Sequence, residues 1–221
     1  MQYLYSESAG INILELKGQE YKYLAKVRRV RINQAIRLRN LKDDNIYRYR
    51  ISDINRQRVL LTLLDFEELI IAPKRYLHLG WAIIDSKNIQ KYLPSLNEIG
   101  VSKITFFYAT RSQKSYKIDF EKLKKILIHS SEQSGRSKMM ELDFCKDTAE
   151  FLEKNPNSYM LNFSQNLLQK SAKIDTIIIG PEGGFTEDEQ TLFKSRIVGL
   201  DCDLILQSQT AAIATASIVL L

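Results

Sequence analysis

The 221-residue chain has only two cysteines, four prolines and nine glycines. Cys145 and Cys202 are too few for a disulfide scaffold, and their spacing from the two histidines is not that of a structural zinc site. So little glycine and proline excludes a collagen-like or low-complexity chain. We therefore expect a globular protein with reduced cysteines and no metal.

Long hydrophobic runs are also absent. The most apolar segment, residues 211–221, is interrupted by Thr215 and Ser217 and is shorter than the roughly 18–20 residues that span a bilayer. The first residues do not have the basic and then apolar order of a signal peptide. These absences predict a cytoplasmic protein with no membrane partner.

Positive charge is concentrated in one part of the chain. The formal net charge is +6, from 32 basic and 26 acidic residues. Residues 22–58 contain twelve basic and three acidic side chains, a local net charge of +9 that leaves −3 for the remainder. A basic module on a mildly acidic body is typical of a protein that binds a polyanion such as RNA, although a solvated basic face gives the same pattern.

The first seventy residues favour short β-strands. Residues 46–51 and 59–64 are strand-like, residues 31–39 alternate in part, and the apolar spacing within residues 20–29 suits a short helix. The pattern predicts a small antiparallel barrel with one helix at residues 1–71.

Residues 72–221 alternate between strand-like and helix-like segments. This alternation predicts an α/β domain with a mostly parallel sheet and helices on its faces. The expected strands are residues 76–83, 103–109, 139–144, 158–163, 175–179 and 203–206, and the expected helices are residues 88–99, 119–134, 145–154, 187–195 and 209–221.

The most informative motif is the glycine-rich turn at residues 180–184. It follows an apolar strand at residues 177–179 and precedes Thr186 and Glu189, which have the spacing of a capping box at a helix start. Glycines at the carboxyl end of a parallel strand let a ligand approach the backbone closely. The turn lacks the lysine of a phosphate loop and is followed by acidic residues, so a cationic ligand such as S-adenosylmethionine fits better than a phosphate. A tight turn without a ligand is the alternative.

A second motif lies near the C-terminus. The strand-like residues 204–206 lead into Gln207–Thr210 and then into a helix rich in alanine, whose small side chains allow close packing. Ser208 or Thr210 can cap this helix. A well-packed terminal helix without a ligand explains the same pattern.

With these motifs the chain resembles the small-subunit ribosomal RNA uridine N3-methyltransferases (the RsmE family) of the knotted SPOUT superfamily. The resemblance covers almost the whole chain, and the glycine-rich turn is its most specific part. The matching segments are Tyr23–Arg29, Glu98–Val101, Glu132–Arg136, Gly180–Glu189 and Leu206–Ala211.

The resemblance implies an architecture and an activity. The expected architecture is an N-terminal PUA-like barrel and a C-terminal SPOUT domain with a deep trefoil knot, through which two copies form a homodimer. The expected activity is methylation of N3 of a uridine in 16S ribosomal RNA, either free or in the assembled small subunit, with S-adenosylmethionine and without a metal. The alternatives are a non-catalytic RNA-binding or ribosome-assembly factor, and a SPOUT enzyme that methylates another base.

The resemblance also implies site residues. The cofactor is expected among residues 161–164, 180–184 and 200–206. Its expected contacts are Phe163, Ile179, Gly180, Gly183, Gly184, Leu200, Cys202, Ile205, Leu206 and Thr210. The expected contacts to RNA phosphates are Lys26, Arg28, Arg29, Arg31 and Arg37.

The chain departs from the family pattern just before the last helix. The family has glycine where this chain has Cys202, arginine where it has Leu204 and Gln207, and glutamate where it has Gln209. The lost arginine removes a cation that would stabilise a uracil anion. We expect Gln207, Gln209 and Arg136 to act at the reaction centre, with Arg136 or Arg111 supplying the missing charge.

Overall fold

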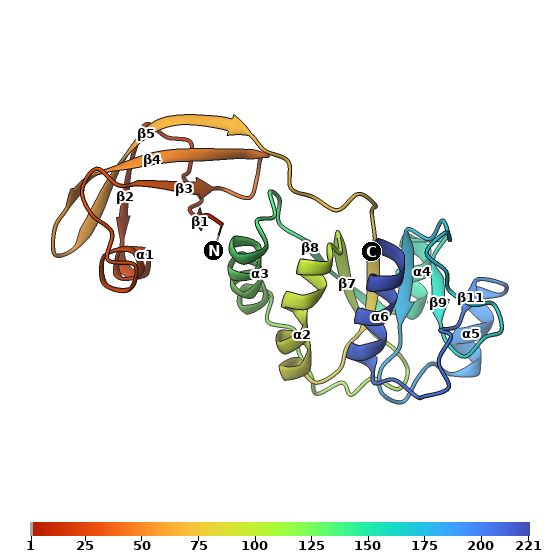
Figure 1. Ribbon diagram of the computed structural model, residues 1–221. Helices are drawn as coiled ribbons and strands as arrows, with labels where there is room; N and C mark the ends of the chain where they lie inside the picture. The colour runs from red at the N-terminus through yellow and green to blue at the C-terminus, as the bar shows by residue number, and fades with distance from the viewer. Residues whose placement is uncertain (1) are drawn as a thin grey trace. The chain divides into compact units, whose positions relative to one another are not determined.

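The computed structural model describes residues 2–221, which divide into two compact units (Figure 1). The first unit contains Met1–Ala72 together with Ile128–Met139, and the second contains Pro73–Leu127 and Met140–Leu221. Unit 1 therefore includes a segment from the middle of the chain. The pattern of strands and helices along the sequence did not predict that residues 128–139 belong to unit 1.

Unit 1 is built on a curled five-stranded sheet with the order β1-β3-β4-β5-β2. β1 pairs in parallel with β3, and the other pairs are antiparallel. Two register shifts interrupt the β4–β5 pairing, and such irregularities bend and twist a sheet. The strands are β1 (Leu4–Tyr5), β2 (Ile13–Lys17), β3 (Ala35–Arg39), β4 (Asn45–Ile54) and β5 (Arg58–Glu68).

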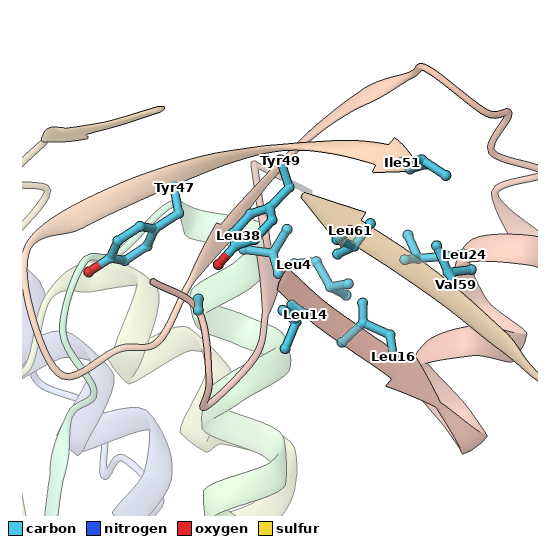
Figure 2. Close-up of a cluster of buried hydrophobic side chains, with 11 residues drawn as sticks. Leu4, Leu14, Leu16, Leu24, Leu38, Tyr47, Tyr49, Ile51, Val59 and Leu61 are labelled. Atoms are coloured by element: carbon cyan, nitrogen blue, oxygen red, sulfur yellow. The ribbon is translucent and has the colours of Figure 1, made fainter. Parts of the chain in front are cut away.

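The concave side of this sheet holds the core of unit 1 (Figure 2). Along β4, Tyr47, Tyr49 and Ile51 are buried while Arg48 and Arg50 are exposed, as the two-residue period of a strand requires. The Tyr49 hydroxyl donates a hydrogen bond to the Ile11 carbonyl (2.7 Å). The tyrosines of β4 therefore belong to the core of unit 1.

Two short helical turns follow β2. α1 (Gly18–Tyr21) continues directly into the π-helix η1 (Lys22–Val27), which confirms a helix in this region. From the segment at residues 128–139, the Glu132 carbonyl accepts the Gln2 N–H (2.8 Å) and the Ser137 hydroxyl donates to Asp44 (2.7 Å). These bonds hold the segment to the rest of unit 1.

Unit 2 is an α/β domain on a six-stranded parallel sheet with the order β11-β9-β10-β6-β7-β8. α2 and α6 pack side by side on one face, and α4 and α5 pack on the other (Figure 1). The strands are β6 (His78–Ala82), β7 (Lys103–Tyr108), β8 (Glu141–Asp147), β9 (Tyr159–Leu161), β10 (Thr176–Ile179) and β11 (Ile197–Val198). The helices are α2 (Ser86–Ile99), α4 (Thr148–Lys154), α5 (Glu187–Phe193) and α6 (Ser208–Leu220), together with the first part of α3 (Phe120–Ser134), whose residues 128–134 belong to unit 1.

The predicted mixed α/β class is confirmed, and the trefoil knot stays a prediction. One predicted strand is wrong. Residues 203–206 form an exposed loop, and Ile197–Val198 takes the sheet edge beside β9 instead. Three apolar residues in a row give a strand signal, but pairing depends on what the fold brings alongside. Across residues 2–221, no helix combines the length and the apolar character needed to cross a membrane.

His78 is a satisfied core residue, since its Nε2 lies 2.8 Å from the Thr105 hydroxyl and burial lowers its pKa to about 4. Gly100 ends α2 in the left-handed conformation (φ 111°), as its position predicts. Both cysteines are free thiols.

Glu189 joins three parts of unit 2. Its carboxylate accepts the Thr186 N–H (2.9 Å), which completes the predicted capping box, and also the Thr110 N–H (3.0 Å) and the Thr148 hydroxyl (2.7 Å). Burial by itself raises the pKa of Glu189, but these hydrogen bonds outweigh burial and hold the pKa below its usual value of 4.5. The ionised carboxylate thereby fixes α5 against the ends of β7 and β8.

We predict that Glu189→Gln lowers the free energy of unfolding at pH 7 by about 1.5–3 kcal/mol, because the amide offers a donor where three donors already point. The depressed pKa means that this stabilisation is fully present above about pH 4.5 and is lost as the pH falls further. Denaturant titration at several pH values measures it. The exposed Glu187→Gln in the same helical turn is the matched control, and an equal loss in both variants would contradict the assignment.

Candidate functional site

A cavity of about 500 Å³ lies at the carboxyl ends of β9 and β10. Three segments form most of its wall: residues 161–167, residues 179–185 and residues 200–206. Ser208 and Ala211, at the start of α6, complete it. Parallel α/β sheets bind ligands at this edge, and the volume suits a small molecule. The three expected loops thus come together around one cavity.

The glycine-rich turn is held in place by Ser208. The Ser208 hydroxyl donates to the Gly180 carbonyl (2.6 Å) and accepts the indole N–H of Trp81 (3.0 Å), so it connects α6, β10 and β6. Gly184 has a φ of 67°, a conformation that glycine adopts without strain. The predicted cap of α6 is wrong: Gln207 occupies the N-cap position without a side-chain hydrogen bond, since the Ser208 hydroxyl is used in the bridge.

The opposite wall depends on Gly199, which the sequence reading missed. A Cβ atom at this position would lie 2.4 Å from the Ser164 carbonyl oxygen, so only glycine lets the two backbones pass. The Gly199 N–H donates to the Asn166 carbonyl (2.9 Å), and its own carbonyl accepts the Leu168 N–H (2.8 Å). A glycine directly after the apolar residues 197–198 is the sequence signal that could have indicated this close approach of two backbones.

The cavity wall is apolar and acidic. Phe163 and Ile205 are exposed by 78% and 84%, which is unusual for such large apolar side chains. Glu182, Asp201 and Asp203 also line the cavity, whereas no lysine or arginine of the described chain does so. Such a wall suits a ligand with an apolar ring and a positive charge, and disfavours a phosphate.

All the predicted cofactor contacts line this cavity except Thr210, which is exposed on α6. Cys202, which stands where the family has glycine, is compatible with the loop, because the φ angle of Cys202 is not positive. Within residues 2–221, the non-glycine residues with positive φ are Arg29, Asn33, Leu41 and Lys194.

The predicted reaction-centre residues are more dispersed. Gln207 is exposed and Gln209 is buried, and the side-chain amide of Gln209 donates to the side-chain oxygen Oε1 of Gln207 (2.5 Å). Neither side chain belongs to the cavity wall. Arg136 lies in the interior of unit 1, where its guanidinium donates to the Lys138 carbonyl (3.1 Å) and burial lowers its pKa to about 10.

Arg111 is the cation that contacts the glycine-rich turn. Its guanidinium donates to the Gly183 carbonyl (2.7 Å), and a Cβ atom on Gly183 would lie 3.3 Å from the Arg111 side chain. Arg111 follows Thr110, whose N–H is bound by Glu189, so its backbone is fixed as well. The five predicted RNA contacts are all exposed side chains of unit 1.

Comparison with known proteins identifies the class of protein to which this architecture belongs. The RNA methyltransferase domain model matches residues 72–220, and the RNA methyltransferase PUA domain model matches residues 16–64. The chain is 41% identical to ribosomal RNA small subunit methyltransferase E of Helicobacter pylori over 99% of both chains. A relative of the same name from Rickettsia conorii is 29% identical, over 96% of this chain and 91% of the relative. The chain belongs to the ribosomal RNA small subunit methyltransferase E family.

Solved structures share the fold. A ribosomal RNA small subunit methyltransferase E from Neisseria gonorrhoeae, bound to S-adenosyl methionine, superimposes with a TM-score of 0.83 at 21% identity, over 98% of this chain and 95% of that one. A methyltransferase from Legionella pneumophila, also in complex with that cofactor, gives a TM-score of 0.84 at 23% identity, over 99% and 96%. The two-part architecture is therefore common to these proteins.

We predict that Ser208→Ala destabilises the protein by about 1–3 kcal/mol, because it leaves the buried indole N–H and the Gly180 carbonyl without their bridge. Trp81 is the only tryptophan of the chain, so the same substitution shifts the fluorescence of the native state. Ser195→Ala, at an exposed serine after α5, is the control and leaves both readouts unchanged. An unshifted native emission in Ser208→Ala would exclude the bridge.

Proposed function

We propose that this protein transfers a methyl group from S-adenosylmethionine to N3 of a uridine in small-subunit ribosomal RNA. The observation that carries the proposal is the acidic and apolar cavity at the glycine-rich turn, in a chain of this family. The names of the relatives support ribosomal RNA as the substrate, and the two solved structures with bound S-adenosylmethionine support the cofactor.

The cavity residues fit the cofactor by their chemistry. Phe163 and Ile205 offer apolar surface to an adenine ring, and the glycine-rich turn lets polar ligand groups reach its backbone. Glu182, Asp201 and Asp203 favour a sulfonium and an ammonium group. When bound, the cofactor supplies an electrophilic methyl group, whose carbon–sulfur bond breaks as a bond to nitrogen forms.

The protein has two tasks at the uracil ring. N3 carries a proton that takes part in base pairing, so the target nucleotide has to be unpaired or drawn out of a helix. The proton passes from N3 to solvent water as the methyl group arrives, and a nearby cation stabilises the negative charge that develops on the base. In this chain we assign that charge to Arg111, which the Gly183 carbonyl and Glu189 hold beside the cavity. Gln207, Gln209 and Arg136 remain candidates for contacts to the substrate.

The basic part of unit 1 is assigned to the RNA backbone. The exposed side chains of Lys26, Arg28, Arg29, Arg31 and Arg37 would contact phosphates. The proposal also includes a cytoplasmic location and a homodimer formed through the knotted C-terminal domain. Light scattering of the purified protein measures the oligomeric state.

A non-catalytic RNA-binding or assembly factor is the second candidate. It is favoured by Gln207 and Gln209, which stand where the family carries charged residues, and by a cavity that no cation of the described chain lines. Nucleotide mapping separates the two. Ribosomal RNA from a strain that lacks the gene, with and without a plasmid copy, is analysed for methylated uridines. A 3-methyluridine that depends on the gene supports the enzyme; an unchanged pattern together with a defect in subunit assembly supports the factor.

We predict that Arg111→Ala lowers kcat by about 10²–10³-fold at saturating cofactor and RNA, as removal of one preorganised charge does in comparable sites. The exposed Lys114→Ala in the same loop is the matched control and leaves kcat unchanged. Calorimetry with S-adenosylmethionine shows whether the loss arises from cofactor binding or from the chemical step.

A related prediction concerns Gln207. If side chains at positions 111 and 207 both reach the negative charge that develops on the base, Gln207→Arg preserves or raises turnover and Gln207→Ala lowers it. In the double variant, Gln207→Arg then restores part of the activity that Arg111→Ala loses. Complete inactivity of a folded, cofactor-binding Gln207→Arg protein would show that this loop is built around glutamine. An unchanged rate in every variant would leave Arg136 as the next residue to test.

A further inference from the structure

A second cavity of about 500 Å³ lies within unit 1 and shares no lining residue with the proposed cofactor site. One part of its wall is apolar or aromatic and comes from Tyr23, Val30 and Ile36, which pack with their other sides on the core of the curled sheet. Another part consists of the guanidinium side chains of Arg28, Arg37 and Arg48. The cavity therefore combines an apolar floor with a basic rim.

The protein balances the positive charge of this rim only in part. Arg37 and Arg48 stand directly opposite each other in the β3–β4 pair, an arrangement of like charges that destabilises a sheet. Arg48 is neutralised by an ion pair with Asp65. No carboxylate of the described chain belongs to the cavity wall, so Arg28 and Arg37 give the rim a net positive charge. An anion bound at Arg28 and Arg37 would balance this charge.

The backbone beside the cavity has two uncommon features. The π-helix η1 occupies Lys22–Val27, and such turns are rare and frequently functional. Arg29 (φ 50°) and Asn33 (φ 69°) both adopt the left-handed conformation, which costs free energy in residues other than glycine. Val27 and Ile32, in the same segment, are exposed by 68% and 54%. The conformation of residues 22–33 and the exposure of their apolar side chains therefore both cost free energy.

We propose that this cavity holds one unstacked nucleotide of single-stranded RNA. The base would lie on the apolar floor beside Tyr23, and the phosphates on either side would lie on Arg28 and Arg37. Aromatic side chains flanked by arginines are the common means of holding single-stranded RNA, and the cavity has the volume of a nucleotide site. This proposal rests on the proposed function only in taking RNA as the polymer that binds. It adds a second nucleotide-binding position, distinct from the target uridine.

The test fills the cavity without removing charge. Ala35 lies in its wall at an exposed position of β3, so Ala35→Trp occupies the space and keeps every arginine. We expect this variant to bind a fluorescein-labelled ten-nucleotide oligouridine about tenfold or more weakly than the wild-type protein, with an unchanged slope against salt. Leu64→Trp, at an exposed position of β5 outside the cavity, is the matched control and retains the wild-type affinity.

A second pair of variants keeps the proposal testable if Ala35→Trp does not fold. Arg28→Ala and Arg37→Ala should each weaken binding and lower the slope of log affinity against log salt by about 0.7, as loss of one phosphate contact on a single strand does. Arg56→Ala, in the exposed turn between β4 and β5, is the control. Wild-type affinity in Ala35→Trp, or unaltered slopes in both arginine variants, would overturn the proposal.

Three further measurements separate this inference from its alternatives. If uridine monophosphate binds as tightly as the oligouridine, the cavity is a small-molecule site instead. If polyglutamate competes with the oligouridine as well as unlabelled RNA does, the cavity binds an acidic peptide. Methylation assays then separate the nucleotide cavity from the proposed function. If Ala35→Trp loses RNA affinity while the wild-type protein does not methylate RNA, only the proposed function is refuted. Methylation by Ala35→Trp with an unchanged KM for RNA refutes the nucleotide cavity alone.

Discussion

The cavity of unit 2 depends on two places where backbone segments come together at the carboxyl edge of the sheet. On one side the Ser208 hydroxyl binds the Gly180 carbonyl and the Trp81 indole, so the start of α6 and the end of β10 cannot separate without exposing buried polar groups. On the other side the absence of a side chain at Gly199 lets the chain pass the Ser164 carbonyl. The space that remains between them is the cavity.

The charges of the two units are arranged for opposite tasks. The cavity of unit 2 is lined by carboxylates and apolar groups, and its neighbouring cation, Arg111, is bound to the rim. The cavity of unit 1 is lined by arginines on an apolar floor. A cationic cofactor and a polyanionic substrate would each be disfavoured in the other's place, since charge complementarity determines where each binds.

Buried polar hydrogen bonds connect distant segments within each unit. Glu189 accepts hydrogen bonds from the turn after β7, from α4 and from the residue that caps its own helix. The Tyr49 hydroxyl accepts the Gly10 N–H and donates to the Ile11 carbonyl, so a core residue of β4 fixes the loop before β2. Each network connects segments that are distant in sequence, and a buried network of this kind is costly to leave incomplete.

The sequence alone determined the local features: the strand–turn–helix at residues 176–193, the capping box of Thr186 and Glu189, the end of α2 at Gly100 and the two kinds of sheet. Each follows from residues a few positions apart, whose conformational preferences and spacing can be read directly. Only the tertiary structure decided that residues 203–206 form a loop, that residues 128–139 belong to unit 1, and that Ser208 bridges Trp81 and Gly180 instead of capping α6. These outcomes depend on which distant groups meet, and for a hydroxyl or a short apolar run several partners satisfy the same local preference until packing selects one.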